Sequence, residues 1–245
     1  IGRFQAKQIA NRNELLRWST ANLTPLKIKG AIARISALAQ MGGDVGLGAS
    51  YLLLSLATGR CPDSLICRIG WSHGAVADEE DMQPENTGSK SKPIVILHPS
   101  INCISLLVNT PPVLKESDWE AVTPRGSYVI VPDYLKVSAY FKSQLQELGI
   151  STTDINTLNR EIVLQSITRA GLALQDLGVS TSQLWQALPR IMQSESGMNT
   201  AMSLLTDWTT QNSLVELHYH CVLASRLAAR YLAAMDTLLD YDKSY

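Results

Sequence analysis

The chain has 245 residues, of which 45% are apolar and 18% charged, and its formal net charge is −1. This length and apolar share are ordinary for a globular protein with a large core, and they exclude collagen-like, low-complexity and fully disordered classes. A net charge near zero argues against a chain that binds polyanions non-specifically over its whole surface, and the low charged share favours a surface partly covered by a partner.

The positive charge is concentrated at the start of the chain. Residues 1–40 contain seven basic groups and one acid, Glu14, whereas the remainder contains 14 basic and 21 acidic groups. A basic segment before an acidic body favours a nucleic-acid contact at one end. A solvated helix face explains the same charges equally well. We expect a basic lead-in over residues 1–24 and one domain over 25–245, and the start at Ile1 favours a fragment of a longer chain.

Helical signals dominate the first 70 residues. Thr24 as N-cap and Pro25 at the first helical position predict a helix start, and Gly42-Gly43 predict its end. Gly46 and Gly48 are typical of a link. A buried helix and a short helix then follow, over Ala49–Ala57 and Pro62–Cys67.

The middle of the chain predicts a small sheet, and the rest predicts helices. Three strand-like runs are separated by turn residues: Ile94–His98, Ile104–Val108 and Tyr128–Val131. Later apolar periodicities predict helices over 134–148, 157–177, 181–193, 199–208 and 214–239, with a break or kink near Pro189. This order predicts an α+β fold, mainly helical, with an antiparallel three-stranded sheet.

No motif for a cofactor or metal is present. The glycine cluster at residues 42–48 lacks a preceding strand and a lysine, and His218 and His220 point to different faces of a helix. The four cysteines form no CxxC pair, which favours reduced, buried thiols and a cytoplasmic location. Since no apolar run reaches about 18 residues, we expect no membrane contact. We therefore predict no cofactor and no metal.

The segment Tyr51–Ile66, followed by Arg68 and Trp71-Ser72, resembles the first motif of tyrosine recombinases, a family that includes phage integrases. Val131-Pro132 is similar to the family's entry into the helix after its sheet, and Val215–Tyr219 is similar to the motif that ends at its nucleophile. The resemblance implies the recombinase catalytic-domain fold, DNA as partner and a homo-oligomer on DNA. It also implies metal-free attack of a tyrosine on a phosphodiester that arginines clamp.

The resemblance assigns site residues one by one. Tyr219 matches the nucleophile in type, but Cys61 stands where the family has an arginine, with Arg60 beside it. Ser182 and Trp185 stand where its His-x-x-Arg motif is expected. We therefore take Tyr219 and Arg60 as catalytic candidates. The candidates for DNA binding are Lys27, Lys29, Arg34, Lys90, Lys92, Lys115 and Arg190.

Three functions are compatible with these residues. The first is a DNA-binding, integrase-like protein of a mobile element with a degenerate catalytic site, in which Cys61 and Trp185 line the former active site. The second is an active DNA strand transferase that uses Tyr219 as nucleophile. The third is a helical protein-interaction module with no role on DNA.

Overall fold

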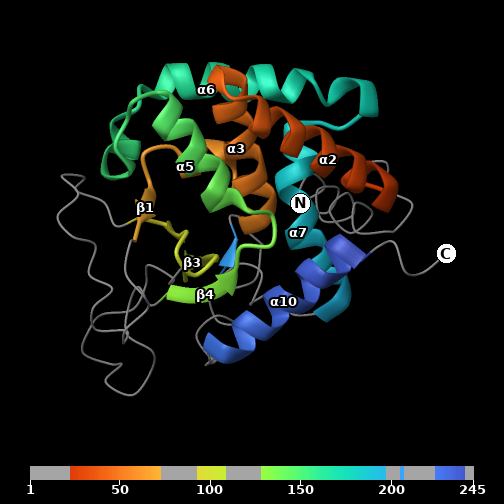
Figure 1. Ribbon diagram of the computed structural model, residues 1–245. Helices are drawn as coiled ribbons and strands as arrows, with labels where there is room; N and C mark the ends of the chain where they lie inside the picture. The colour runs from red at the N-terminus through yellow and green to blue at the C-terminus, as the bar shows by residue number, and fades with distance from the viewer. Residues whose placement is uncertain (1–22, 73–92, 109–127, 197–204, 207–223, 241–245) are drawn as a thin grey trace, which may run out of the picture.

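A computed structural model of the protein describes residues 23–72, 93–108, 128–196, 205–206 and 224–240 (Figure 1). Helices come first, the sheet follows, and further helices complete the fold. The elements, in chain order, are α2 (Pro25–Met41), α3 (Gly43–Thr58), α4 (Pro62–Leu65), β1 (Ile69–Trp71), β2 (Val95–His98), β3 (Cys103–Leu107), β4 (Tyr128–Pro132), α5 (Val137–Glu147), η3 (Thr152–Thr157), α6 (Arg160–Leu172), η4 (Gln175–Leu177), α7 (Thr181–Ser196) and α10 (Ala224–Asp240). The expectation of a mainly helical α+β fold is confirmed.

Helix α2 begins and ends where the sequence predicts. The Thr24 hydroxyl accepts a hydrogen bond from the Lys27 backbone N–H at 3.4 Å, and Pro25 occupies the first turn of α2. Gly42, with φ of 80°, ends the helix. This capping satisfies a backbone donor that has no partner inside the helix.

The prediction of a glycine link before Ala49 is wrong, because α3 already begins at Gly43. Gly46 and Gly48 lie within this helix, and Gly48 faces the backbone of α6. A Cβ atom at Gly48 would overlap the carbonyl group of Ser166. The glycine therefore allows two helices to approach more closely than a side chain permits.

Three other helix boundaries differ from the predicted ones. Helix α5 begins at Val137 rather than at residue 134, because both oxygens of Asp133 accept from the first backbone N–H groups, those of Val137 and Ser138. The helix predicted over 157–177 ends at Leu172 and is followed by η4. Helix α7 continues through Pro189 to Ser196 without a break. Residues 199–204, 207–208 and 214–223 of the predicted later helices lie outside the described residues.

The sheet has four strands in the order β1-β2-β3-β4. The three predicted strands are β2, β3 and β4, but the prediction that they form the whole sheet is wrong, because β1 is a fourth strand. Strands β2, β3 and β4 are antiparallel neighbours, but β1 pairs with β2 in parallel, with Ile69 opposite Val95. Three residues, Ile-Gly-Trp, are too few to show the alternation that marks a strand in sequence.

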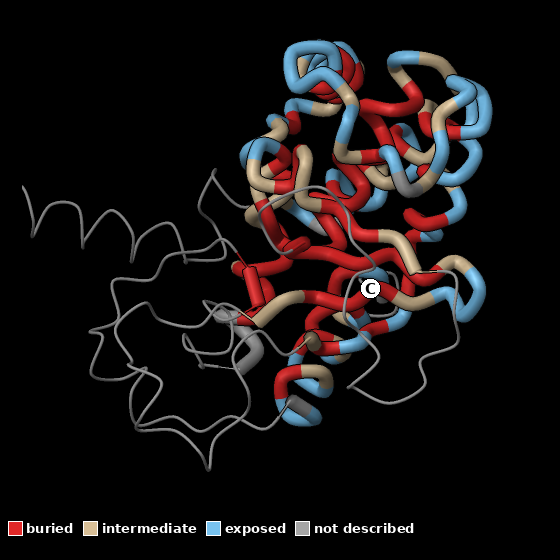
Figure 2. The backbone as a smooth tube through the Cα atoms, turned by 90° about the vertical axis from the view of Figure 1, so that its left-hand side faces the viewer, coloured by how far each residue is buried: buried red, intermediate tan, exposed pale blue. Residues whose placement is uncertain are grey.

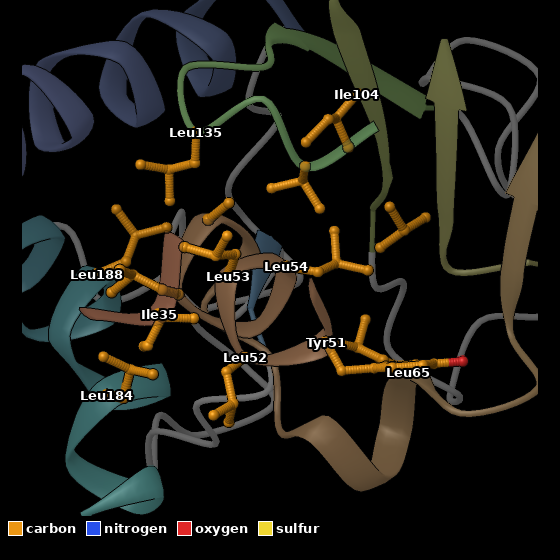
Figure 3. Close-up of a cluster of buried hydrophobic side chains, with 14 of the residues drawn as sticks. Ile35, Tyr51, Leu52, Leu53, Leu54, Leu65, Ile104, Leu135, Leu184 and Leu188 are labelled. Carbon is orange, nitrogen blue, oxygen red and sulfur yellow. The ribbon is translucent and has the colours of Figure 1, made fainter. Parts of the chain in front are cut away.

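The core is centred on α3, which lies among α2, α5, α6 and α7, with the sheet below them in Figure 1 and α10 packed against β4 and α7. Figure 3 shows side chains of α3 between α2, α7 and the sheet: Tyr51, Leu52, Leu53 and Leu54, with Ile35, Leu184, Leu188, Leu135 and Ile104 around them. The Tyr51 ring meets Phe141 of α5 edge-on, with 5.0 Å between centroids. Exposed residues lie mainly on outer surfaces of the helices (Figure 2).

None of the helices that the structure describes is long and apolar enough to cross a membrane.

Candidate functional site

The turn after α3 brings distant parts of the chain together. Gly59 ends the helix in the left-handed conformation, with φ of 62°. A Cβ atom there would lie 2.7 Å from Thr206 Cγ2 and 2.9 Å from Pro189 Cδ. Both the positive φ and this crowding favour glycine. The Thr58-Gly59-Arg60-Cys61 segment therefore lies against α7 and against residues 205–206.

Helix α10 is fixed to the same end of α3. The Tyr231 hydroxyl donates to the carbonyl oxygen of Ala57 at 2.6 Å. Ala57 lies in the last turn of α3, where carbonyl groups have no partner within the helix. Burial raises the pKa of Tyr231, so the phenol keeps the proton that it donates. The last described helix is thereby joined to the turn that carries Arg60.

Arg60, a catalytic candidate from the sequence, lies in the interior with an exposed fraction of 1%. Its Nη2 donates to the carbonyl oxygen of Leu107 at 2.7 Å. The Leu107 N–H donates to the Ile94 carbonyl, whereas the Ile94 N–H donates to the Arg68 carbonyl. The Ile94 N–H, just before β2, therefore does not donate to the Leu107 carbonyl, and Arg60 donates to that carbonyl instead. This contact gives Arg60 a structural role at the end of the sheet.

Arg68 lies immediately before β1, and β2 separates this strand from β3, which ends at Leu107. Its backbone is held on both sides, because its N–H donates to Leu65 and its carbonyl accepts from Ile94. Its side chain is half-buried, and Nε is shielded from solvent without a hydrogen-bond partner. Burial raises the pKa of the Tyr128 phenol, and the positive charge of Arg68 offsets part of this rise. The net result is a pKa of about 12. The Tyr128 hydroxyl donates to the Pro93 carbonyl at 2.8 Å. The sequence analysis assigned no role to Arg68. No pattern in the sequence indicates that its Nε lacks a hydrogen-bond partner.

Arg190, predicted to bind DNA, lies on α7 one residue after Pro189, which packs against Gly59. The side chain is half-buried, and Nη2 donates to Gln186 Oε1 at 2.8 Å. Cys61 is half-buried at the N-cap of α4, and Trp185 is half-buried on α7. The elements that carry Arg60, Cys61 and Arg190 thus meet at the turn after α3.

The other described DNA-binding candidates lie on α2. Lys27, Lys29 and Arg34 are all exposed. The Lys27 ammonium donates to the carbonyl of Gly178, just after η4, at 3.4 Å. Helix α2 contains no acidic residue, and none occurs between Glu14 and Asp44. Its solvent-facing charge is therefore uniformly positive.

Four predicted site residues, Tyr219, Lys90, Lys92 and Lys115, lie outside the described residues. Tyr219 as nucleophile and the three lysines as DNA contacts stay predictions. Within the described part of the chain, no group of three or more His, Cys, Asp or Glu side chains is placed to hold a metal ion.

The chain matches no protein-family model, and neither a curated protein nor a solved structure shows significant similarity to it.

Proposed function

We propose that the protein is a DNA-binding, integrase-like protein of a mobile element whose tyrosine-recombinase-like catalytic site is degenerate. The proposal rests on the charge of α2, whose ionisable side chains are all basic. Lys27, Lys29 and Arg34 are exposed there with no acid on the same helix. Exposed cations attract the phosphate backbone and release its counterions, which supplies sequence-independent affinity for DNA.

The surroundings of Arg60 support the degenerate character of the site. A phosphodiester clamp needs guanidinium donors directed at the reacting oxygens. Cys61 stands where the family has an arginine, and the Arg60 Nη2 is bonded to the Leu107 carbonyl in a site closed to solvent. Loss of one preorganised donor commonly lowers kcat by a factor of about 10² to 10³. DNA binding without efficient strand cleavage is the function that these residues favour.

The proposal is tested by replacing the three cations of α2 together, in the variant Lys27→Gln/Lys29→Gln/Arg34→Gln. The matched control is Lys142→Gln/Arg160→Gln/Arg169→Gln on α5 and α6, which removes the same charge from other exposed positions. Binding of a labelled DNA duplex is followed by fluorescence anisotropy between about 50 and 200 mM salt. Each lost phosphate contact lowers the slope of log K against log salt by about 0.9.

We expect the α2 variant to lose about two to three units of slope and the control variant less than one. An equal loss in both variants would mean that only total charge matters, and α2 would then not be the DNA-binding surface. A wild-type protein that does not bind DNA at low salt would contradict the proposed function itself.

A further inference from the structure

Arg68 is an unsatisfied cation at the end of the sheet. No hydrogen bond or ion pair to its guanidinium is present in the structure of the described residues, and its Nε is closed off from water. Leaving a buried donor unpaired is unfavourable, because the group loses its hydrogen bonds to water without gaining others. Two exposed arginines of the described residues do have an acidic neighbour: Arg160 is paired with Asp63 at 3.5 Å, and Arg169 with Asp44 at 3.2 Å.

The position of Arg68 is fixed by its neighbours. The hydrogen bonds to Leu65 and Ile94 hold its backbone between α4 and β2. Tyr128 lies beside it, and the hydroxyl of that residue is directed to the Pro93 carbonyl at 2.8 Å. A side chain whose backbone is already fixed loses less conformational entropy when an anion binds than one on a mobile backbone.

A second guanidinium reaches the same end of the sheet. Arg60 contacts the carbonyl of Leu107, and Leu107 is the residue directly opposite Tyr128 in the β3–β4 register. Two arginines are thus brought to the same end of the sheet, one at the start of β1 and the other at the end of β3, with β2 between these strands. Positive charge in partly desolvated surroundings attracts an anion more strongly than an exposed lysine does.

We propose that Arg68 binds a phosphate oxyanion through the terminal nitrogens of its guanidinium, and that the backbone phosphodiester of DNA is the source of this anion. Nη1 and Nη2 present two parallel N–H groups, the geometry that pairs with two phosphate oxygens. The shielded Nε limits the approach to this end-on arrangement. The inference rests on the proposed function where it names DNA as the source of the anion. The binding of a phosphate oxyanion by Arg68 does not depend on the proposed function.

Two arms test it, and the variants are Arg68→Lys, Arg68→Gln and, as control, Arg169→Gln. In the first arm, binding of a DNA duplex is measured by anisotropy against salt. We expect Arg68→Gln to bind about tenfold or more weakly and to lose about one unit of salt slope, and Arg169→Gln to change binding less than about twofold. Arg68→Lys keeps the charge without the fork, so we expect it to recover only part of the affinity.

In the second arm, inorganic phosphate is titrated into the wild-type protein, and the Arg68 Nε–Hε resonance, assigned by its absence in Arg68→Lys, is followed by NMR. We expect a saturable shift. Thermal unfolding of each variant gives the structural readout, and we expect no fall in Tm, because the described residues give the Arg68 guanidinium no hydrogen bond or ion pair to lose.

The outcomes are distinguishable. DNA affinity equal in Arg68→Gln and Arg169→Gln, or a resonance that phosphate does not move, would overturn the inference while leaving the proposed function intact. Wild-type protein that shifts with phosphate but does not bind DNA would overturn the proposed function and the assignment of the anion to DNA.

Discussion

Substituting Gly48 with alanine tests how α3 is packed into the core. A Cβ atom at this position would overlap the backbone carbonyl of Ser166 and would lie 2.7 Å from the backbone nitrogen of Ile167. These are main-chain atoms of α6, which cannot move aside by a change of rotamer. The two helices must therefore separate if the methyl group is to fit.

Two opposing effects set the size of the change. Alanine is about 1 kcal/mol better than glycine in the interior of a helix. Overpacking a core commonly costs about 1–3 kcal/mol, and an obstruction made of backbone belongs at the upper end of that range. We therefore expect Gly48→Ala to lower the free energy of unfolding by about 2 kcal/mol, which corresponds to a fall in Tm of about 4–8 °C for a chain of this size.

Gly30→Ala is the matched control, because Gly30 lies inside α2 and its nearest neighbour would be Leu177 Cδ1 at an ordinary 3.6 Å. Here only the helix propensity changes, and we expect stabilisation of about 0.5–1 kcal/mol. Urea unfolding followed by circular dichroism measures both variants. A Gly48→Ala protein as stable as the wild type would refute the close approach of α3 and α6.

Two further predictions concern buried polar side chains. Tyr231→Phe removes the donor to the Ala57 carbonyl and leaves a buried acceptor unpaired, so we expect a loss of about 1–3 kcal/mol in urea unfolding, and a change below about 0.3 kcal/mol would contradict the anchoring of α10. His98 is 2% exposed, its Nε2 lies 2.7 Å from Ser105 Oγ, its Nδ1 has no partner, and burial lowers its pKa. The unfolded chain therefore binds a proton more readily than the folded chain, so stability falls as the pH drops below about 6.5. Comparing urea unfolding at high and low pH in wild type and His98→Asn tests this, and an identical pH dependence in both proteins would count against it.

Local signals predicted the start of α2 but not the close approaches between elements. Thr24 and Pro25 act within one turn of chain, so the start of α2 was readable from the sequence. The role of Gly48 depends on Ser166, which lies more than a hundred residues away, and glycine alone favours a link. Strand β1 is recognised by its pairing with β2, because its three residues show no alternation of apolar and polar side chains. Pairings of this kind leave no local pattern in the sequence.

The same limit applies to the site. The sequence drew attention to Arg60, but its burial depends on an unused carbonyl at Leu107, 47 residues later. Arg68 belongs to the segment that resembles a recombinase motif, yet its unpaired Nε follows only from the packing around it. The exposed cations of α2 were predicted from the charge pattern alone, because a helix without an acidic residue offers them no ion-pair partner on the same helix.

The salt dependence of DNA binding, measured together with a nicked suicide substrate that traps covalent complexes, tests the central claim most directly. We expect the wild-type protein to bind duplex DNA with an affinity that falls steeply as salt rises, and to form no covalent adduct. An adduct that disappears in Tyr219→Phe would establish an active strand transferase and contradict the degenerate site. The absence of binding even at low salt would contradict DNA binding and favour a protein-interaction role.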